Sequence, residues 1–103
     1  MTIIVMGHIK AAPEEIVRLR DAISAAVAAT NAEQGCEHYR FSVDLDDPGT
    51  LYINERWASA EALAAHGASE HLKTFNRAIG GAALTEVSVK AWNGEFWRTL
   101  VGN

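Results

Sequence analysis

Residues 55–75 read ERWASAEALAAHGASEHLKTF, and this stretch decides the fold that the sequence predicts. It opens at the end of a strand and then takes on helical character. Ser59 suits the N-cap of the helix, because its hydroxyl can accept a backbone N–H of the first turn. Gly67 is expected to end that helix, and Ser69 to cap a further one. The stretch therefore predicts a strand that leads directly into a broken helix.

A β-hairpin is predicted just before this stretch. Residues 36–45 alternate with a period of two, which is typical of a strand with one buried face. The run Asp-Asp-Pro-Gly at residues 46–49 then supplies the turn. On the returning strand, one face is expected to carry Leu51, Ile53, Glu55 and Trp57, and the other face Tyr52, Asn54 and Arg56. The two segments are thus predicted to pair antiparallel.

Three further elements complete the predicted fold. Residues 3–9 form an expected first strand that is apolar on both faces. A single helix is predicted to begin at Pro13 and to stop by Gly35, and a last strand is expected around residues 87–92. The order strand, helix, strand, strand, broken helix, strand predicts an α+β fold of the ferredoxin-like βαββαβ type. Such a fold has a four-stranded antiparallel sheet with its helices on one face.

Length and composition exclude several classes of protein. The 103 residues, 49% of them hydrophobic, predict a single domain over residues 1–103. A net charge of -4 argues against nucleic acid as a partner, since phosphate binding needs clustered Lys and Arg. The apolar runs are too short for a signal peptide or a membrane span, so no membrane partner is expected. Cys36 is the only cysteine and cannot form an intrachain disulfide, which favours a cytoplasmic location.

A homodimer is predicted from apolar surface that one subunit cannot cover. Helices can cover only one face of the predicted sheet, yet both faces of residues 3–6 are apolar. The uncovered face is therefore expected to meet a second subunit. The tail at residues 93–103 also carries Phe96, Trp97, Leu100 and Val101, and it is expected to pack across the partner.

Most of the reactive side chains fall within residues 55–75, and each also has a structural interpretation. His66 lies near a predicted helix C-terminus, where an imidazole interacts well with the helix dipole. His71 could simply bridge helix and sheet, and Glu55 could accept hydrogen bonds from buried donors. Trp57 is expected to pack in the core. Because Gly67 interrupts the helix, one working histidine is more plausible than a catalytic pair.

The sequence resembles the antibiotic biosynthesis monooxygenase family over nearly the whole domain. The matching positions are Gly35-Cys36, Asp47-Pro48, Glu55-x-Trp57-x-Ser59-x-Glu61-Ala62-Leu63, His66-x-x-Ser69-x-His71-Leu72 and Phe75. The resemblance implies small dimers in which two ferredoxin-like subunits join their sheets into a barrel. It also implies oxygenation of a small electron-rich aromatic, such as a quinol or anthrone, with dioxygen as co-substrate and no cofactor.

The resemblance assigns roles to particular residues. His66 or His71 would be the base that deprotonates the substrate, because imidazole titrates near neutral pH. Trp57 and Phe75 would wall a flat ring. Asn54, Tyr52 or Arg56 would hydrogen-bond a quinone oxygen if their strand face lines the pocket, while Glu55 would have a structural or orienting role.

Metal and haem binding are not expected. The four histidines lack the paired spacing of a helical zinc motif, and no cysteine pair is present. The same barrel occurs in haem-degrading relatives, but the position that corresponds to their axial histidine is Asn76, and asparagine does not normally ligate haem iron. Only a shifted alignment that uses His71 would allow haem binding. Two alternatives to the monooxygenase stay open: a non-enzymatic ligand-binding or dimerisation module, and an isomerase of a small metabolite.

Overall fold

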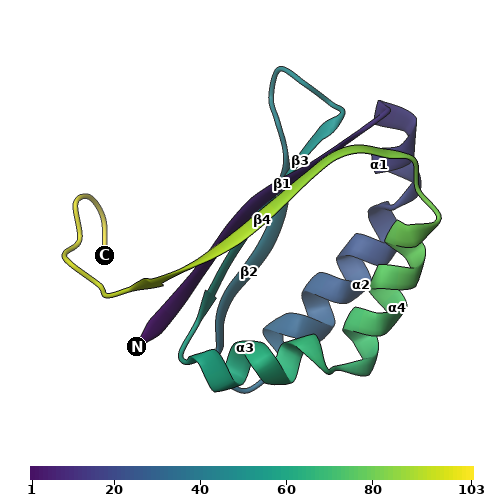
Figure 1. The fold of residues 1–103 in the computed structure, drawn as a ribbon. Helices are drawn as coiled ribbons and strands as arrows, with labels where there is room; N and C mark the ends of the chain where they lie inside the picture. The colour runs from purple at the N-terminus through teal and green to yellow at the C-terminus, as the bar shows by residue number, and fades with distance from the viewer.

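The computed structural model describes all residues from Met1 to Asn103. Its elements, in chain order, are β1 (Thr2–Ala11), α1 (Pro13–Arg18), α2 (Arg20–Asn31), β2 (Cys36–Val43), β3 (Thr50–Trp57), α3 (Ala60–Gly67), α4 (Glu70–Gly80) and β4 (Leu84–Gly94) (Figure 1). The βαββαβ order is confirmed, with each helical unit divided in two.

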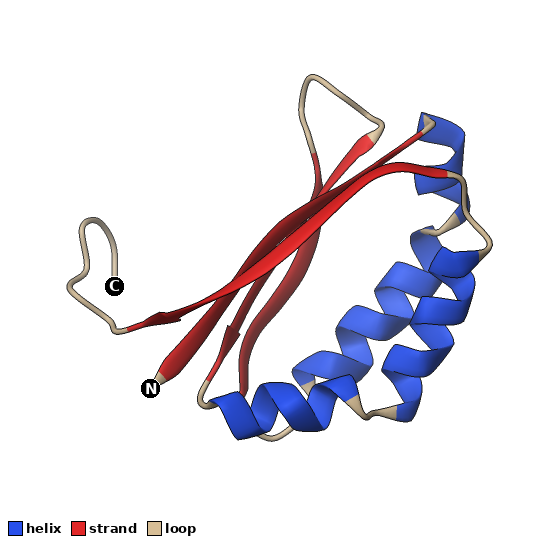
Figure 2. Ribbon diagram, in the orientation of Figure 1, coloured by secondary structure: helices blue, strands red, loops and turns tan.

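The four strands form one antiparallel sheet in the order β2-β3-β1-β4. Val5 in β1 lies opposite Glu55 in β3 and Ala91 in β4, so these three residues share one face of the sheet. All four helices lie on that face and leave the other one bare (Figure 2). The predicted ferredoxin-like arrangement is therefore what the structure contains.

The break in the second helical unit is also confirmed, and the two serines explain it. Ser59 Oγ accepts the backbone N–H of Ala62 at 3.1 Å, which caps α3. Ser69 Oγ accepts the N–H of Leu72 at 3.3 Å, which caps α4. Each hydroxyl satisfies a backbone donor that has no partner within its helix. Two short helices can then change direction around Gly67 without losing these bonds.

Two predicted boundaries were wrong. The first helix is not continuous, because a turn at Leu19 divides α1 from α2 and buries the Leu19 side chain almost completely. The second strand ends at Val43 rather than Leu45. There Asp44 Oδ1 accepts the backbone N–H groups of Asp46 and Asp47 at 2.8 and 3.0 Å. These bonds begin the turn early, and the hairpin tip extends beyond the helices (Figure 1).

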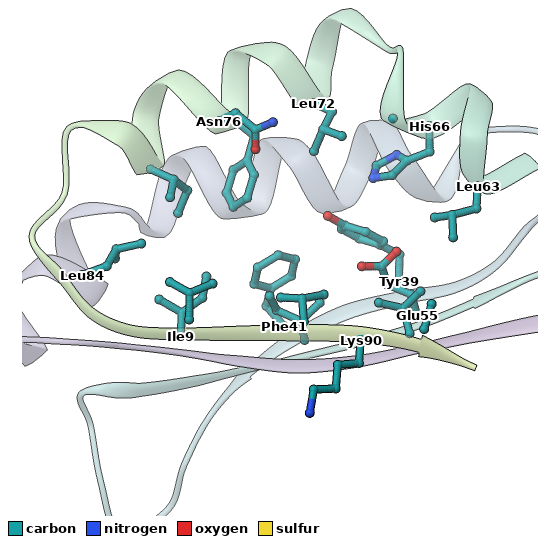
Figure 3. Close-up of a pocket in the computed structure, with 18 residues that line it drawn as sticks. Ile9, Tyr39, Phe41, Glu55, Leu63, His66, Leu72, Asn76, Leu84 and Lys90 are labelled. Carbon is teal, nitrogen blue, oxygen red and sulfur yellow. The ribbon is translucent and has the colours of Figure 1, made fainter.

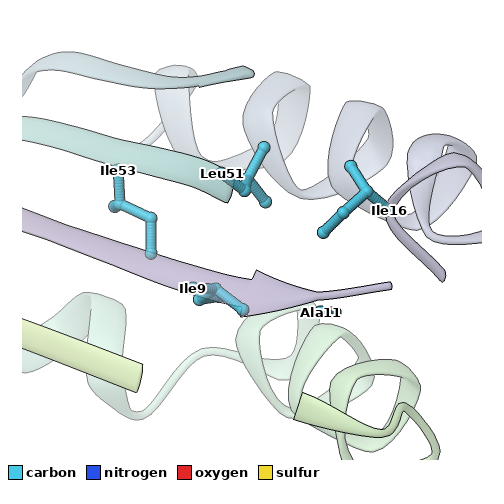
Figure 4. Packing of buried hydrophobic residues seen from close by; sticks show 5 residues of the cluster. All are labelled: Ile9, Ala11, Ile16, Leu51 and Ile53. Atoms are coloured by element: carbon cyan, nitrogen blue, oxygen red, sulfur yellow. The ribbon is translucent and has the colours of Figure 1, made fainter. Parts of the chain in front are cut away.

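Two groups of buried side chains fill the space between sheet and helices. Figure 4 shows the first group, which consists of Ile9, Ala11, Ile16, Leu51 and Ile53. The second group consists of Ile3, Val5, Tyr39 and Trp57. The strand members of both groups alternate with residues of the bare face, as the period-two pattern predicts.

The bare face of the sheet and the C-terminal tail expose apolar side chains. On the bare face, Met6, Tyr52 and Trp92 are 52%, 40% and 50% exposed. Residues 95–103 follow β4 and run away from the helices (Figure 1), and Phe96, Trp97 and Val101 are more exposed still. None of the four helices is both long and apolar enough to span a membrane.

Candidate active site

A cavity of about 490 Å³ lies between the sheet and the helices α3 and α4 (Figure 3). Of its 18 lining residues, 13 are hydrophobic, and they come from all four strands as well as both helices. Val87 and Val89 of β4 line it although they are about half exposed, so the cavity opens beside this edge strand. Its size and apolar character are typical of small-molecule sites.

His66 reaches the cavity from the C-terminal end of α3 and is only 5% exposed. Its Nδ1 lies 2.6 Å from Glu33 Oε2. An ionised carboxylate can only accept, so Nδ1 carries the proton and Nε2 holds a free lone pair. Nε2 has no partner in the protein and is not completely buried. The side chain therefore combines an anchored nitrogen with one free to accept a proton.

Two aromatic rings hold the His66 imidazole in place. The ring centroid of Trp57 lies 4.9 Å away, and that of Tyr39 lies 5.4 Å away in an edge-on arrangement. Such contacts between rings favour one orientation of the imidazole. Together with the Glu33 hydrogen bond, they restrict both rotation and tilt of this side chain.

His71 approaches the same carboxylate but does not reach the cavity. Its Nε2 lies 3.1 Å from Glu33 Oε2 and 3.3 Å from Ser69 Oγ. His71 lines a smaller hollow of about 170 Å³ between α2 and α4 instead. The structure thus brings the two predicted histidines to one carboxylate, and it places only His66 against the larger cavity.

Glu33 is the residue of this site that sequence reasoning missed. It lies in the short connection between α2 and β2, and Gly35 two residues later has a φ of +84°. A Cβ at Gly35 would lie 2.6 Å from Ala62 Cβ, so glycine lets this connection pass close to α3. The only available signal was the position of Glu33 just before Gly35-Cys36, which does not reveal a partner in α3.

Glu55 also points into the cavity, from β3. Its Oε1 accepts a hydrogen bond of 2.8 Å from Trp57 Nε1. Burial raises the pKa of Glu55, while the Trp57 hydrogen bond and nearby His66 act in the opposite direction. The sequence predicted a structural or orienting role, and the Trp57 hydrogen bond supplies a structural one.

Comparison with known proteins places this arrangement in a family. The sequence profile described as antibiotic biosynthesis monooxygenase matches residues 2–78. The chain belongs to the antibiotic biosynthesis monooxygenase family. No curated protein matches the chain closely enough to count as a relative.

Solved structures of other proteins share the whole fold. A candidate antibiotic biosynthesis monooxygenase from Deinococcus radiodurans is 27% identical, with a TM-score of 0.88 over 97% of this chain and 99% of that one. The Rv0793 protein of Mycobacterium tuberculosis is 25% identical, with a TM-score of 0.84 over 96% and 100% of the two chains. PA3566 of Pseudomonas aeruginosa is 28% identical, with a TM-score of 0.81 over 92% and 95%.

In this member of the antibiotic biosynthesis monooxygenase family, the two aromatic residues predicted to wall the substrate differ in position. Phe75 of α4 lines the cavity and packs edge-on against Phe41, with ring centroids 5.6 Å apart. Trp57 is completely buried behind His66 and does not line the cavity. Tyr39, which was predicted only as a strand residue, does line it, and burial followed by the charge of Glu55 raises its pKa.

The polar residues predicted to contact substrate lie on the opposite face of the sheet. Tyr52, Asn54 and Arg56 alternate with Ile53 and Glu55, and none of the three lines the cavity. The hydroxyl of Tyr52 donates to Asp44 Oδ2 at 2.6 Å, and Arg56 donates to Glu37 Oε1 at 3.1 Å. The prediction left open which face of this strand lines the pocket; the cavity is on the Glu55 face.

The Glu33, His66 and His71 side chains also bring three potential metal ligands within 4.8 Å of one another. Their contacts of 2.6 and 3.1 Å through one oxygen are hydrogen-bond lengths. Two ligands of a tetrahedral zinc ion would lie about 3.3 Å apart, given metal–ligand bonds near 2.0 Å. In this structure the three side chains form a carboxylate hydrogen-bonded to two imidazoles.

Proposed function

We propose that the protein is a cofactor-independent monooxygenase that oxidises an electron-rich aromatic substrate, such as a quinol or an anthrone, with His66 as the base. One observation carries the proposal: His66 lines an apolar cavity with Nδ1 held by Glu33 and Nε2 free. A general base must lie within reach of the substrate proton and be oriented toward it. Membership of the antibiotic biosynthesis monooxygenase family supports the reaction class.

The cavity suits a flat and largely apolar substrate. Phe41 and Phe75 offer aromatic surfaces, and Ile9, Ile53 and Ile79 extend the apolar wall. Three polar lining residues, Tyr39, Glu55 and His66, lie close together on one side of the cavity in Figure 3. An aromatic ring could bind over the apolar part while its oxygen or acidic carbon faces the His66 imidazole.

The reaction can proceed on the substrate's own electrons once a proton has been removed. For an anthrone, His66 Nε2 would take a proton from the ring CH₂ group, which leaves a carbanion conjugated with the carbonyl. This anion reduces dioxygen and forms a C–O bond, giving a hydroperoxide after protonation. Loss of water converts that carbon to a second carbonyl, so that CH₂ plus O₂ becomes C=O plus H₂O.

Glu33 would assist by holding the imidazole and by stabilising its protonated form. A carboxylate on Nδ1 fixes the tautomer in which Nε2 is the acceptor, and its negative charge favours the imidazolium that forms. His71 would act indirectly, because its Nε2 contacts the same oxygen of Glu33. It is proposed as a positioning residue rather than as a second base.

No haem is included in the proposed reaction. The position that the family resemblance relates to an axial histidine is Asn76, which lines the cavity. An amide side chain is a poor ligand for haem iron. Dioxygen is instead proposed to react directly with the deprotonated substrate.

Oxygen uptake with anthrone and a panel of quinols tests the proposal. We expect His66→Ala to lower kcat/KM by about 10²–10⁴-fold, the usual contribution of a general base. His71→Ala should lower it by about tenfold or less, since only the positioning of Glu33 is affected. A matched control is His38→Ala, because His38 lies on the bare face of the sheet.

The assignment would be contradicted if the two histidine variants had the opposite effects on oxygen uptake. If His71→Ala abolished oxygen uptake while folded His66→Ala kept it, His66 could not be the base. Absence of uptake with every quinol and anthrone tested would argue against the monooxygenase as a whole. Circular dichroism of each variant is needed, because His66 is a buried residue.

The proposal includes a homodimer, as predicted from the sequence. Met6, Tyr52 and Trp92 leave apolar surface on the bare face, and Phe96 and Trp97 add more on the tail. Exposed apolar side chains of this kind are typical of interaction sites. A second copy of the chain offers an equivalent apolar face with which it could pair. A cytoplasmic location is proposed as well, on the basis of the single unpaired Cys36.

A further inference from the structure

The cavity contains a second ionisable group that the proposed reaction does not use. Glu55 extends from β3 toward the helices, and in Figure 3 its carboxylate lies below the His66 imidazole and beside the Tyr39 ring. Oε1 is occupied by the Trp57 Nε1 hydrogen bond of 2.8 Å. The second oxygen, Oε2, has no partner in the protein and is not completely buried. One oxygen is therefore anchored and the other is available to a bound molecule.

The groups that face Glu55 favour the protonated carboxyl. Tyr39 from β2 and Val5 from β1 flank it in the sheet. Burial is the main reason that its pKa is raised, and the negative charge of Glu33 adds to that effect. His66 and the Trp57 N–H oppose it. The only Lys or Arg that lines the cavity is Lys90, and its side chain points away in Figure 3.

The arrangement around Glu55 mirrors the one around His66. In each side chain a neighbouring group anchors one polar atom, Trp57 for Glu55 and Glu33 for His66. The second polar atom of each is left free, and both residues line one apolar cavity. A carboxylic acid that can donate and an imidazole that can accept are the two groups needed to move protons within one substrate.

We propose that Glu55 and His66 form an acid–base pair that interconverts the keto and enol forms of an aromatic ketone, in the absence of dioxygen. This inference rests on the proposed function for the cavity and for His66 as base. It adds a second activity and assigns Glu55 as a catalytic residue. The substrate class is a neutral aromatic ketone with an acidic C–H group conjugated to its carbonyl, of which anthrone is the simplest example.

The proton transfers balance without any oxidant. The C–H bond breaks and its proton goes to Nε2 of His66, while the electron pair moves through the conjugated system to the carbonyl oxygen. Glu55 donates its proton to that oxygen, which forms the O–H bond of the enol. The imidazolium then loses a proton to solvent and the Glu55 carboxylate regains one, so the product is an isomer of the substrate.

Anaerobic hydrogen exchange tests this step separately from the reaction with oxygen. Anthrone is incubated in D₂O without oxygen, and deuterium at its CH₂ carbon is followed by proton NMR against a protein-free control. We expect the wild-type protein to accelerate the exchange and His66→Ala to remove the acceleration. Glu55→Ala should lower it by about 10²-fold, the usual effect of removing one donor to a developing oxyanion.

Glu55→Gln distinguishes a catalytic acid from a structural residue. The amide oxygen can still accept from Trp57 Nε1, which turns the NH₂ group toward the position of the free carboxyl oxygen. A hydrogen-bond donor therefore remains, but an amide cannot give up a proton, so this variant should fold normally and lose most of the exchange activity. The wild-type rate should fall as pH rises through the raised pKa of Glu55, and this fall should be absent in Glu55→Gln. Glu61→Gln, an exposed change on α3, serves as the matched control.

Three results would overturn the inference. The first is a folded Glu55→Gln variant that keeps the full wild-type exchange rate, because an amide cannot donate the proton that the step requires. The second is full exchange activity in Glu55→Ala. The third is oxygen uptake with anthrone but no accelerated exchange, which would leave the proposed monooxygenase standing without this activity. Exchange without oxygen uptake would instead support the acid–base pair and contradict the monooxygenase.

Discussion

The two faces of the sheet are built from alternate residues of the same strands, yet they have different environments. Val5 and Trp57 on the helix-covered face are almost completely buried, whereas Met6, Tyr52 and Trp92 on the bare face are 40–52% exposed. Because neighbouring side chains in a strand point in opposite directions, one step along the chain moves from core to surface. The candidate chemistry is confined to the covered face, where burial can hold and tune reactive groups.

The largest expected difference in stability is between two alanine variants, one for a tryptophan on each face. Trp57→Ala should lower the free energy of unfolding by about 3–5 kcal/mol, because it creates a cavity and removes the donor to Glu55. Trp92→Ala should cost about 0.5 kcal/mol or less in the separated subunit, since Trp92 is half exposed there. Urea unfolding at protein concentrations low enough to separate the proposed dimer measures both losses. Equal losses under these conditions would contradict the difference between the two faces.

A second prediction concerns what covers the bare face. The double variant Met6→Glu and Trp92→Glu should raise the dimer dissociation constant by about 30-fold or more, because charges would replace apolar contacts. Sedimentation equilibrium measures this constant. Val17→Glu is the matched control, since Val17 is 72% exposed on α1 in the helical layer. A wild-type protein that stays monomeric, or a double variant that pairs equally well, would refute the proposed interface.

The connection that carries Glu33 provides a third test, at a smaller magnitude. Gly35→Ala should destabilise the fold by about 1–3 kcal/mol, because φ is +84° and the new Cβ would lie 2.6 Å from Ala62 Cβ. Gly67→Ala is the matched control, as its Cβ would meet nothing within 4 Å. It should be neutral or slightly stabilising within α3. Thermal unfolding measures the stability of both variants. Equal stabilities of Gly35→Ala and Gly67→Ala would contradict the prediction.

The smallest expected effect is a dependence of stability on pH that arises from Glu55. Burial raises its pKa above 4.5, so the folded chain holds this proton more tightly than the unfolded chain does. Stability from this group is present below the ordinary pKa and is lost as pH rises through the raised one. Glu55→Gln removes that contribution. The unfolding free energy of the variant, relative to that of the wild type, should therefore increase as pH rises. Parallel curves of unfolding free energy against pH for the two proteins would refute the prediction.

Local signals account for the parts of the fold that the sequence predicted well. Ser59 and Ser69 cap their helices through hydrogen bonds between residues three apart in sequence, and such bonds do not depend on distant segments. The two wrong boundaries, at Leu19 and Leu45, lie where the hydrophobic pattern continues past a local turn. The helix period does not reveal a turn that buries Leu19, and strand alternation past Val43 does not reveal that Asp44 begins the hairpin turn.

The candidate site was predicted less completely because its contacts are long-range. Glu33 is separated by 33 residues from His66 and by 38 from His71, and no local pattern links them. Periodicity placed Tyr52 and Asn54 on one face and Glu55 on the other, but it could not show which face borders a cavity. That depends on which side the helices cover, and hence on how distant segments pack.

The sequence by itself determined the order of elements, the break near Gly67, the family and the small set of reactive side chains. Propensity, capping and alternation act over a few residues, so they can be read along the chain. Tertiary structure alone decided that His66 rather than His71 borders the cavity, that Glu33 anchors it, and that Trp57 lies behind the site. These outcomes follow from packing between segments far apart in sequence, which sets burial and hydrogen-bond partners only once the chain has folded.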